Sequence, residues 1–396
     1  MTQPRAARIA VAYIFFANGA VGGNWVTRIP ALKIKLDLSN ASLGFAFLAA
    51  PIGAILAMPL AGWLVARFGS SRTTRVAIPL WCASVVPIGF APNLYVLWAV
   101  IFVLGAISAV LDVAMNAHGL VVERRYKRPI LSSFHAWFSL GGLVGAGTGA
   151  LAVHAHLTLQ SHISLVAAIA ATGGLALGFL LLRGAEDVTA EKKKFFVKPP
   201  HQLITLGFVA FASMLAEGAI ADWSAVYIHE PLHSSQTIAA FGYFGYSLTM
   251  VLGRYLGDPL SARFGPVALT RAGGLLGAGS LTVALLVGNP VAAILGFAGA
   301  GVGLAAVVPT VFRAAGSRSD VASGVGITSV SAVGYTGFLV GPPLIGTTAH
   351  FLGLPAALGI VAMFMTVIGV LAGSAAPAAA PGGSQEPTLG ADAQVF

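Results

Sequence analysis

Long apolar runs dominate this sequence and leave few folds open to it. A helix that crosses the hydrocarbon core of a bilayer needs about 20 mostly apolar residues, and the chain contains twelve runs of that kind. A membrane barrel would instead alternate apolar and polar residues. We therefore predict an all-α membrane protein with twelve transmembrane helices. The expected helices lie near residues 8–29, 40–66, 73–91, 94–121, 130–154, 160–182, 203–228, 236–257, 266–287, 290–312, 321–348 and 354–374.

The low content of charged residues supports this class. Only 9% of the 396 residues are charged and 57% are hydrophobic, whereas a soluble domain carries about 25% charged residues. The lone cysteine, Cys82, excludes a disulfide framework and a cysteine-based metal site. The sequence also has no Walker loop, zinc signature or Ser/His/Asp set. We therefore expect no enzymatic activity, no cofactor and no bound metal.

The distribution of basic residues predicts the orientation in the membrane. With both termini in the cytoplasm, 19 of the 22 lysines and arginines fall at cytoplasmic helix ends, and only Arg28, Lys33 and Lys35 fall outside. This asymmetry follows the positive-inside rule, and it explains the net charge of +9 without nucleic acid as a partner. We predict a multi-pass protein of the bacterial inner membrane, monomeric and surrounded by lipid.

An internal repeat divides the chain in two. The segment Leu64–Gly69 (LVARFG) recurs as Leu260–Gly265 (LSARFG), 196 positions later. The same offset aligns residues 132–150 with residues 328–346, where 6 of 19 positions are identical. One offset that serves two distant segments indicates duplication of a unit half the length of the chain.

The duplication predicts two pseudo-symmetric halves of six helices each, residues 1–182 and 203–374. The polar segment 183–202 reads as a cytoplasmic linker between them, and the Ala/Pro/Gly-rich segment 375–396 as a disordered cytoplasmic tail. Two such halves place a central binding site between them, near the middle of the membrane.

The segment Gly62–Arg72 (GWLVARFGSSR) resembles the loop signature that the major facilitator superfamily carries between its second and third helices. A sister copy follows the eighth predicted helix, as in that family. In both copies an alanine, Ala66 or Ala262, stands where the family has an acid. We expect Asp258 to supply a substitute ion pair with Arg254 one helical turn away. The resemblance implies a set of cytoplasmic gating residues, namely Gly62, Arg67, Gly69, Arg72, Arg254, Asp258 and Arg263.

Other passages resemble the fucose-permease-like members of that superfamily, in particular the MosC/YbjJ-type branch. These passages are Trp25–Pro30, Asp112–Asn116, Ser133–His135, Glu217–Ser224 and Gly253–Asp258. The fucose/proton symporter of this group carries a key acid on its fourth helix, and the resemblance makes Asp112 its counterpart. That symporter has a second key acid on its first helix. The comparable stretch here offers Asn18 and Asn24 instead.

Three acids lie well inside the predicted spans: Asp112, Glu217 and Asp222. A charged side chain at the centre of a bilayer costs at least about 2.5–3.5 kcal/mol, so each needs a reason to be there. Asn116 follows Asp112 on the same helical face. We expect these acids to contact a proton or a substrate, although each could also serve as a hydrogen-bonded link between helices.

Further polar and aromatic side chains complete the predicted site. The pKa of histidine suits His135 to proton relay. Arg28 is expected to pair with Asp222 or Asp37, to attract an anionic substrate, or to lie at the interface. Amides and rings that suit a sugar come from Asn18, Asn24, Trp25, Tyr246 and Tyr335.

These expectations combine into one predicted function. We expect a secondary transporter that moves a small polar solute, such as a sugar or cyclitol, by alternating access coupled to protons, or to sodium in their place. A drug or metabolite exporter of the same fold is the alternative. A membrane sensor or scaffold without transport is a more distant one.

Overall fold

The computed structural model describes residues 3–126, 130–182, 203–316 and 323–376. The predicted linker 183–202 and nearly all of the predicted tail lie outside these ranges. The first half of the chain forms α1 (Gln3–Val26), α2 (Ile29–Lys35), α3 (Asn40–Phe68), α4 (Ser70–Val85), η1 (Val86–Phe90), α5 (Leu94–Tyr126), α6 (Leu131–His154) and α7 (Leu159–Gly178). The second half forms α8 (Ile204–His229), α9 (Gln236–Phe264), α10 (Pro266–Val287), α11 (Pro290–Leu304), α12 (Val307–Gly316), α13 (Ser323–Leu352), α14 (Leu354–Leu371) and η4 (Ala372–Ala375).

The predicted all-helical class is confirmed for the described residues, each predicted span having a helix or a helix pair at its position. Ten described segments are long and apolar enough to cross a membrane. One of them, Ser329–Ala375, contains both α13 and α14, and α9 is not among the ten. Helix α9 carries Arg254, Asp258 and Arg263, which lower its hydropathy. The structure is therefore consistent with twelve spans.

The internal repeat is visible in the backbone geometry. Helices α3 and α9 begin and end 196 positions apart, and each begins after a serine, Ser39 or Ser235, that caps the helix through its side chain. Both helices end at a glycine with nearly the same backbone angles, φ 82° and ψ 154° at Gly69 and φ 84° and ψ 154° at Gly265. Only glycine adopts these angles without strain, so the repeated turn requires glycine in both copies.

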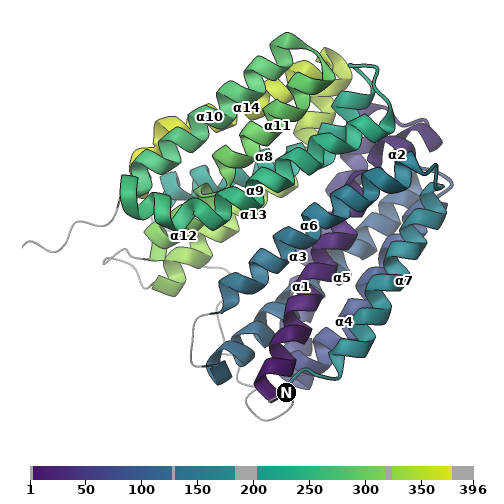
Figure 1. Ribbon diagram of the computed structural model, residues 1–396, viewed down its shortest axis with the longest axis vertical. Coiled ribbons are helices and arrows are strands. Elements are labelled where there is room, and N and C mark those ends of the chain that lie inside the picture. The colour runs from purple at the N-terminus through teal and green to yellow at the C-terminus, as the bar shows by residue number, and fades with distance from the viewer. Residues whose placement is uncertain (1–2, 127–129, 183–202, 317–322, 377–396) are drawn as a thin grey trace, which may run out of the picture.

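The helices pack into two bundles, α1–α7 and α8–α14, which lie at an angle to each other (Figure 1). Equivalent pairs pack in each: α3 against α5 matches α9 against α11, and α1 against α6 matches α8 against α13. Between the bundles, α6 packs against α9 and α3 packs against α13. Gly44 of α3 approaches the backbone of Pro342 and Gly346 in α13 so closely that a methyl group would overlap it.

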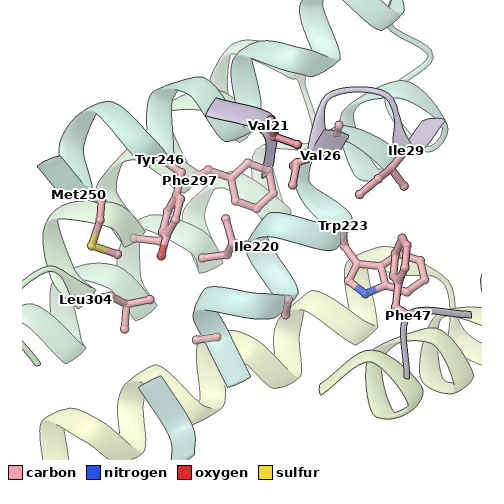
Figure 2. Packing of buried hydrophobic residues seen from close by; sticks show 14 of the residues in the cluster. Val21, Val26, Ile29, Phe47, Ile220, Trp223, Tyr246, Met250, Phe297 and Leu304 are labelled. Carbon is pink, nitrogen blue, oxygen red and sulfur yellow. The ribbon is translucent and has the colours of Figure 1, made fainter. Parts of the chain in front are cut away.

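The two bundles converge near α2 and diverge towards the opposite ends of their helices (Figure 1). We call these the α2 end and the basic end, the latter marked by Arg67, Arg72 and Arg263. At the α2 end, Phe47 of α3 lies edge-on to Trp223 of α8, with ring centroids 6.2 Å apart. Figure 2 shows this pair beside Ile29 in the buried hydrophobic core.

A salt bridge reinforces the contact at the α2 end. Lys33 Nζ of α2 lies 2.5 and 2.6 Å from the two carboxylate oxygens of Glu230, which directly follows α8. The amide of Asn40, at the start of α3, donates to the Ala349 carbonyl of α13 at 3.5 Å. The inter-bundle bonds of the α2 end thus join α2 to α8 and α3 to α13.

Candidate functional site

Asp112 lies in the middle of α5, with Asn116 one turn further on. The Asn116 amide donates to Asp112 Oδ1 at 3.1 Å and to the Asp112 carbonyl oxygen at 2.9 Å. Among the described residues, Asp112 has no cationic partner. Its side chain is exposed although it lies deep within an apolar helix. The carboxylate therefore faces an accessible space and not a packed interior.

Arg254 connects the two bundles at a similar depth. Its Nη2 atom donates to Glu217 Oε1 of α8 at 3.3 Å, and its Nη1 atom donates to Ser139 Oγ of α6 at 3.0 Å. The side chains of Arg254 and Glu217 are 35% and 28% exposed, so the ion pair is in contact with solvent. A guanidinium suits this role because its planar fork reaches two acceptors at once.

The position of Arg254 corrects one expectation. We predicted this residue at a cytoplasmic gate, but it lies ten residues before the end of α9, about 15 Å along the helix axis. Its predicted pairing with Asp258 stays a prediction. Its carboxylate partner is Glu217 on another helix. The side chain of Asp258 lies outside the described part of the structure. Glu217 lies on α8, so a search limited to the neighbouring turns of α9 does not find it.

His135 and a set of tyrosines surround this ion pair. His135 precedes Ser139 by one turn of α6, its ring is edge-on to Phe15 at 5.2 Å, and it is within electrostatic reach of Arg254. Tyr335 of α13 is within electrostatic reach of both Asp112 and Glu217, and it is 49% exposed. Tyr335 therefore lies in the same region as the α5 acid and the α8 acid.

A second group of aromatic rings lies on α9. Tyr243 and Tyr246 stack with ring centroids 6.1 Å apart, and both are within electrostatic reach of Glu217 and Arg254. Tyr243 is also within reach of Asp222, which is half-buried on α8. The Tyr246 hydroxyl is buried and has no hydrogen-bond partner in the described structure. The polar centre therefore draws on α5, α6, α8, α9 and α13, which belong to both bundles.

The predicted residues of α1 lie elsewhere. Asn18 is buried, and its amide contacts Met115 Sδ of α5 at 3.8 Å. Asn24 accepts hydrogen bonds at Oδ1 from Thr148 Oγ1 at 3.2 Å and pairs there with His162 Nε2 at 2.8 Å. Asn24 is thus committed to a network inside the first bundle.

Trp25 and Arg28 lie at the α2 end. The Trp25 ring is edge-on to Phe47 at 6.5 Å. Arg28 is 4% exposed, and its Nη2 atom donates to the Leu157 carbonyl at 2.8 Å. Burial lowers the pKa of this guanidinium, which stays charged at neutral pH. In the described structure Arg28 makes no ion pair with Asp222 or Asp37, which was one of the expected roles, and its hydrogen-bond partner is the Leu157 carbonyl in the connection after α6.

The remaining predicted gating residues are at the basic end. Gly62 and Arg67 belong to α3, so only Gly69 occupies a connection between helices. Arg72 lies in the first turn of α4. The Arg263 guanidinium lies 5.3 Å from the centroid of the Phe264 ring. Among described residues there is also no group of three His, Cys, Asp or Glu side chains that could hold a metal ion.

The sequence matches the family model of the Major Facilitator Superfamily over residues 11–323. The protein named "Uncharacterized transporter y4wD" of Sinorhizobium fredii is 34% identical over 365 residues, which cover 91% of this chain and 96% of that protein. Membrane protein MosC of Rhizobium meliloti is 33% identical over 364 residues, covering 91% of this chain and 87% of that one.

Two solved structures have the same fold at low sequence identity. The nucleoside transporter NupG is 13% identical, with a TM-score of 0.73 over 95% of this chain and 99% of that chain. A bacterial homologue of the lysosomal transporter Spinster, in an inward-facing and unoccupied conformation, is 14% identical, with a TM-score of 0.72 over 95% of this chain and 97% of that one. The chain belongs to the major facilitator superfamily and is a multi-pass membrane transporter of that type.

Proposed function

We propose that this chain is a proton-coupled transporter of a small polar solute, such as a sugar or cyclitol, in the bacterial inner membrane. The carrying observation is the accessible polar centre in which Arg254 joins Glu217 and Ser139 across the bundles, with Asp112 and Glu217 both within electrostatic reach of Tyr335. An apolar drug would displace water from these charged groups without offering them hydrogen-bond partners, at a high cost. With both termini in the cytoplasm, the basic end is the open, cytoplasmic side of this conformation.

Asp112 is the proposed proton carrier. In the described structure it accepts a hydrogen bond from Asn116 and has no cation to neutralise it. An isolated carboxylate in the middle of a span is neutralised most simply by a proton. Loading this proton removes the charge that would otherwise oppose closure of the space around Asp112, and its release on the other side resets the carrier.

Arg254 is the proposed link between solute and conformation. It holds Glu217 of its own bundle and Ser139 of the other bundle, so a solute that binds Arg254 competes with both contacts. The Arg254 guanidinium supplies five N–H donors. Hydroxyl groups of a polyol can accept hydrogen bonds from these donors in place of the Ser139 and Glu217 oxygens. Tyr335 and His135 offer a ring face and a polar edge beside the same space.

The solute class is tested first, by thermal unfolding of the purified protein with sugars, cyclitols, amino sugars and lipophilic cations. A ligand that binds only the folded state raises the unfolding temperature. Stabilisation by polyols supports the proposal. Stabilisation confined to lipophilic cations would overturn it in favour of a drug exporter of the same fold.

Coupling is tested in proteoliposomes with the solute identified in that screen. An imposed pH gradient should drive uptake by the wild-type protein and not by Asp112→Asn, which should still exchange solute down its own gradient. Asp37→Asn is the matched control, because Asp37 undergoes the same chemical change on an exposed turn outside the spans. Gradient-driven uptake that survives in Asp112→Asn would exclude Asp112 as the coupling acid, and drive by a sodium gradient alone would exclude the proton.

A further inference from the structure

A groove runs along the outer surface of the first bundle at the basic end. Its volume is about 790 Å³, within the range of ligand pockets in proteins. Helix α1 supplies most of its lining, and α5, α6 and α7 supply one residue each. The lining residues are Arg5, Arg8, Ile9, Ala12, Tyr13, Phe16, Tyr126, Trp137 and Leu177.

The groove is separate from the polar centre between the bundles. Helix α6 lies between α1 and the second bundle, since it packs against both α1 and α9. Figure 1 shows α1 flanked by α6 and α7 at the front of the first bundle. The face of α1 that contacts the interior carries Phe15, which packs on Phe134 and His135. The groove therefore opens towards the surroundings of the protein.

Its lining changes from charged to apolar along α1. Arg5 and Arg8 are exposed at the basic end. Phe16 lies 11 residues after Arg5, about 16 Å further along the helix. Ile9 and Ala12 lie between them, and Leu177 faces them from α7. The Phe16 ring is edge-on to Trp137 of α6 at 6.3 Å. This gradient from cationic to apolar spans about half of a hydrocarbon core about 30 Å thick.

The two arginines make few contacts with the described residues. Within the described ranges, neither Arg5 nor Arg8 has a hydrogen bond or a carboxylate partner, and the one contact of Arg8 is with the Tyr126 ring, 5.3 Å from its centroid. Glu123, the acid nearest to Tyr126 in sequence, is occupied by the backbone amides of Ile130 and Leu131, at 2.7 Å each. A ligand with one negative charge at its polar end would complement this site.

We propose that this groove binds one anionic phospholipid. Its phosphate lies between Arg5 and Arg8, and one acyl chain lies along Ile9, Phe16 and Leu177. An amphipathic ligand of this kind matches both ends of the groove. A soluble anion or an acidic peptide would match the arginines but would not fill the apolar part. Basic residues at the membrane surface attract anionic lipid in this way, and the Tyr126 ring beside Arg8 suits the same depth.

The experiment counts lipids bound to the detergent-purified full-length protein by native mass spectrometry. Phosphatidylglycerol should bind at one tight site and phosphatidylcholine should not. Arg5→Gln and Arg8→Gln should each weaken phosphatidylglycerol binding about fivefold, and the double variant about thirtyfold. Arg263→Gln is the matched control, since Arg263 also lies at the basic end over an aromatic ring but outside the groove, and it should bind as the wild type does.

A second measurement does not depend on the arginine variants. Phosphatidylglycerol with brominated acyl chains should quench tryptophan fluorescence, and at one lipid per protein Trp137→Phe should reduce the quenched fraction more than Trp63→Phe does, although Trp63 is the more exposed ring. Equal binding of both lipids, equal loss in Arg263→Gln, or quenching unchanged in Trp137→Phe would each overturn the proposal. So would displacement of the lipid by glycerol phosphate at a similar concentration, because that result would assign the site to a soluble anion.

Discussion

The salt bridge between Lys33 and Glu230 should control how readily the α2 end opens. It joins α2 of one bundle to the end of α8 in the other, so it exists only while the bundles are in contact there. The perturbation is Glu230→Gln, which keeps the shape of the side chain and removes its charge. The variant should favour conformations in which the α2 end is open.

The burial of the two side chains sets the size of the effect. The Lys33 side chain is 10% exposed and that of Glu230 is 32% exposed. Exposed ion pairs contribute about 0–1 kcal/mol, and loss of one partner from a fully buried pair costs about 3–5 kcal/mol. This half-buried pair lies between these limits, at about 1–3 kcal/mol, which changes the ratio of closed to open molecules by about 5-fold to 150-fold.

The assay is a distance measurement between spin labels on the two bundles. Tyr95 in α5 and Val291 in α11 are 82% and 66% exposed, occupy equivalent positions in the repeat, and lie in the first turns of their helices at the α2 end. Both are replaced by cysteine in a chain whose only natural cysteine, Cys82, is buried and is changed to alanine. The longer of two distance populations should grow in Glu230→Gln.

Lys35 provides the matched control. It follows Lys33 by two residues, but its Nζ atom donates to the carbonyl oxygens of Gly89 and Ala91 within the same bundle. Lys35→Gln should leave the distance distribution unchanged. An unchanged distribution in Glu230→Gln, or the same change in Lys35→Gln, would refute the reasoning. Reversal of the two charges, Lys33→Glu with Glu230→Lys, should restore much of the closed population.

Three further predictions follow from single contacts. Arg254→Gln removes the charge that binds Glu217 and should reduce uptake of the identified solute at least about tenfold, the loss expected for one charge-assisted contact of about 1.5–3 kcal/mol. Gly69→Ala should destabilise the protein by about 1–3 kcal/mol, because its φ of 82° strains any side chain. Asn24→Ala should cost about 1–3 kcal/mol by leaving the buried His162 ring without its acceptor. Thermal unfolding in detergent measures the last two.

Controls distinguish these effects from general damage. Ser139→Ala keeps the Glu217 contact of Arg254 and removes its contact with the other bundle, so it should reduce uptake less than Arg254→Gln does. Gly22→Ala places a methyl group where no atom lies within 4 Å, in a helix, and should be neutral or slightly stabilising. Unaltered uptake in Arg254→Gln, or equal destabilisation by Gly22→Ala and Gly69→Ala, would contradict the corresponding prediction.

Most of the helix positions could be predicted because they depend on local properties. Apolar runs and capping residues such as Ser39, Ser235 and Asn289 act within a few residues of the chain, and they mark the starts of α3, α9 and α11. Differences appeared where local signals conflicted. The predicted helix 290–312 is divided into α11 and α12. Helix α9 continues to Phe264, beyond its predicted end at residue 257, because charged residues need not end a helix that is in contact with solvent.

The candidate site was less predictable. The sequence identified Asp112, Glu217 and Asp222 because a charge within an apolar run is conspicuous, and it paired Asp112 with Asn116 because four residues make one helical turn. It placed Asn24 and Arg28 in the same site, whereas the structure engages them with His162 and the Leu157 carbonyl. Ser139 went unnoticed because a lone serine in a helix carries no signal of its own.

The sequence by itself determined the class, the duplicated halves and the family, because hydrophobic length, repeated turns and motif residues are all properties of neighbouring positions. Only the tertiary structure decided which charges meet. The partners Arg254 and Glu217 are 37 residues apart, Arg254 and Ser139 are 115 apart, and Lys33 and Glu230 are 197 apart. Each of these contacts depends on which faces of distant helices pack together, and that choice is made by the whole bundle.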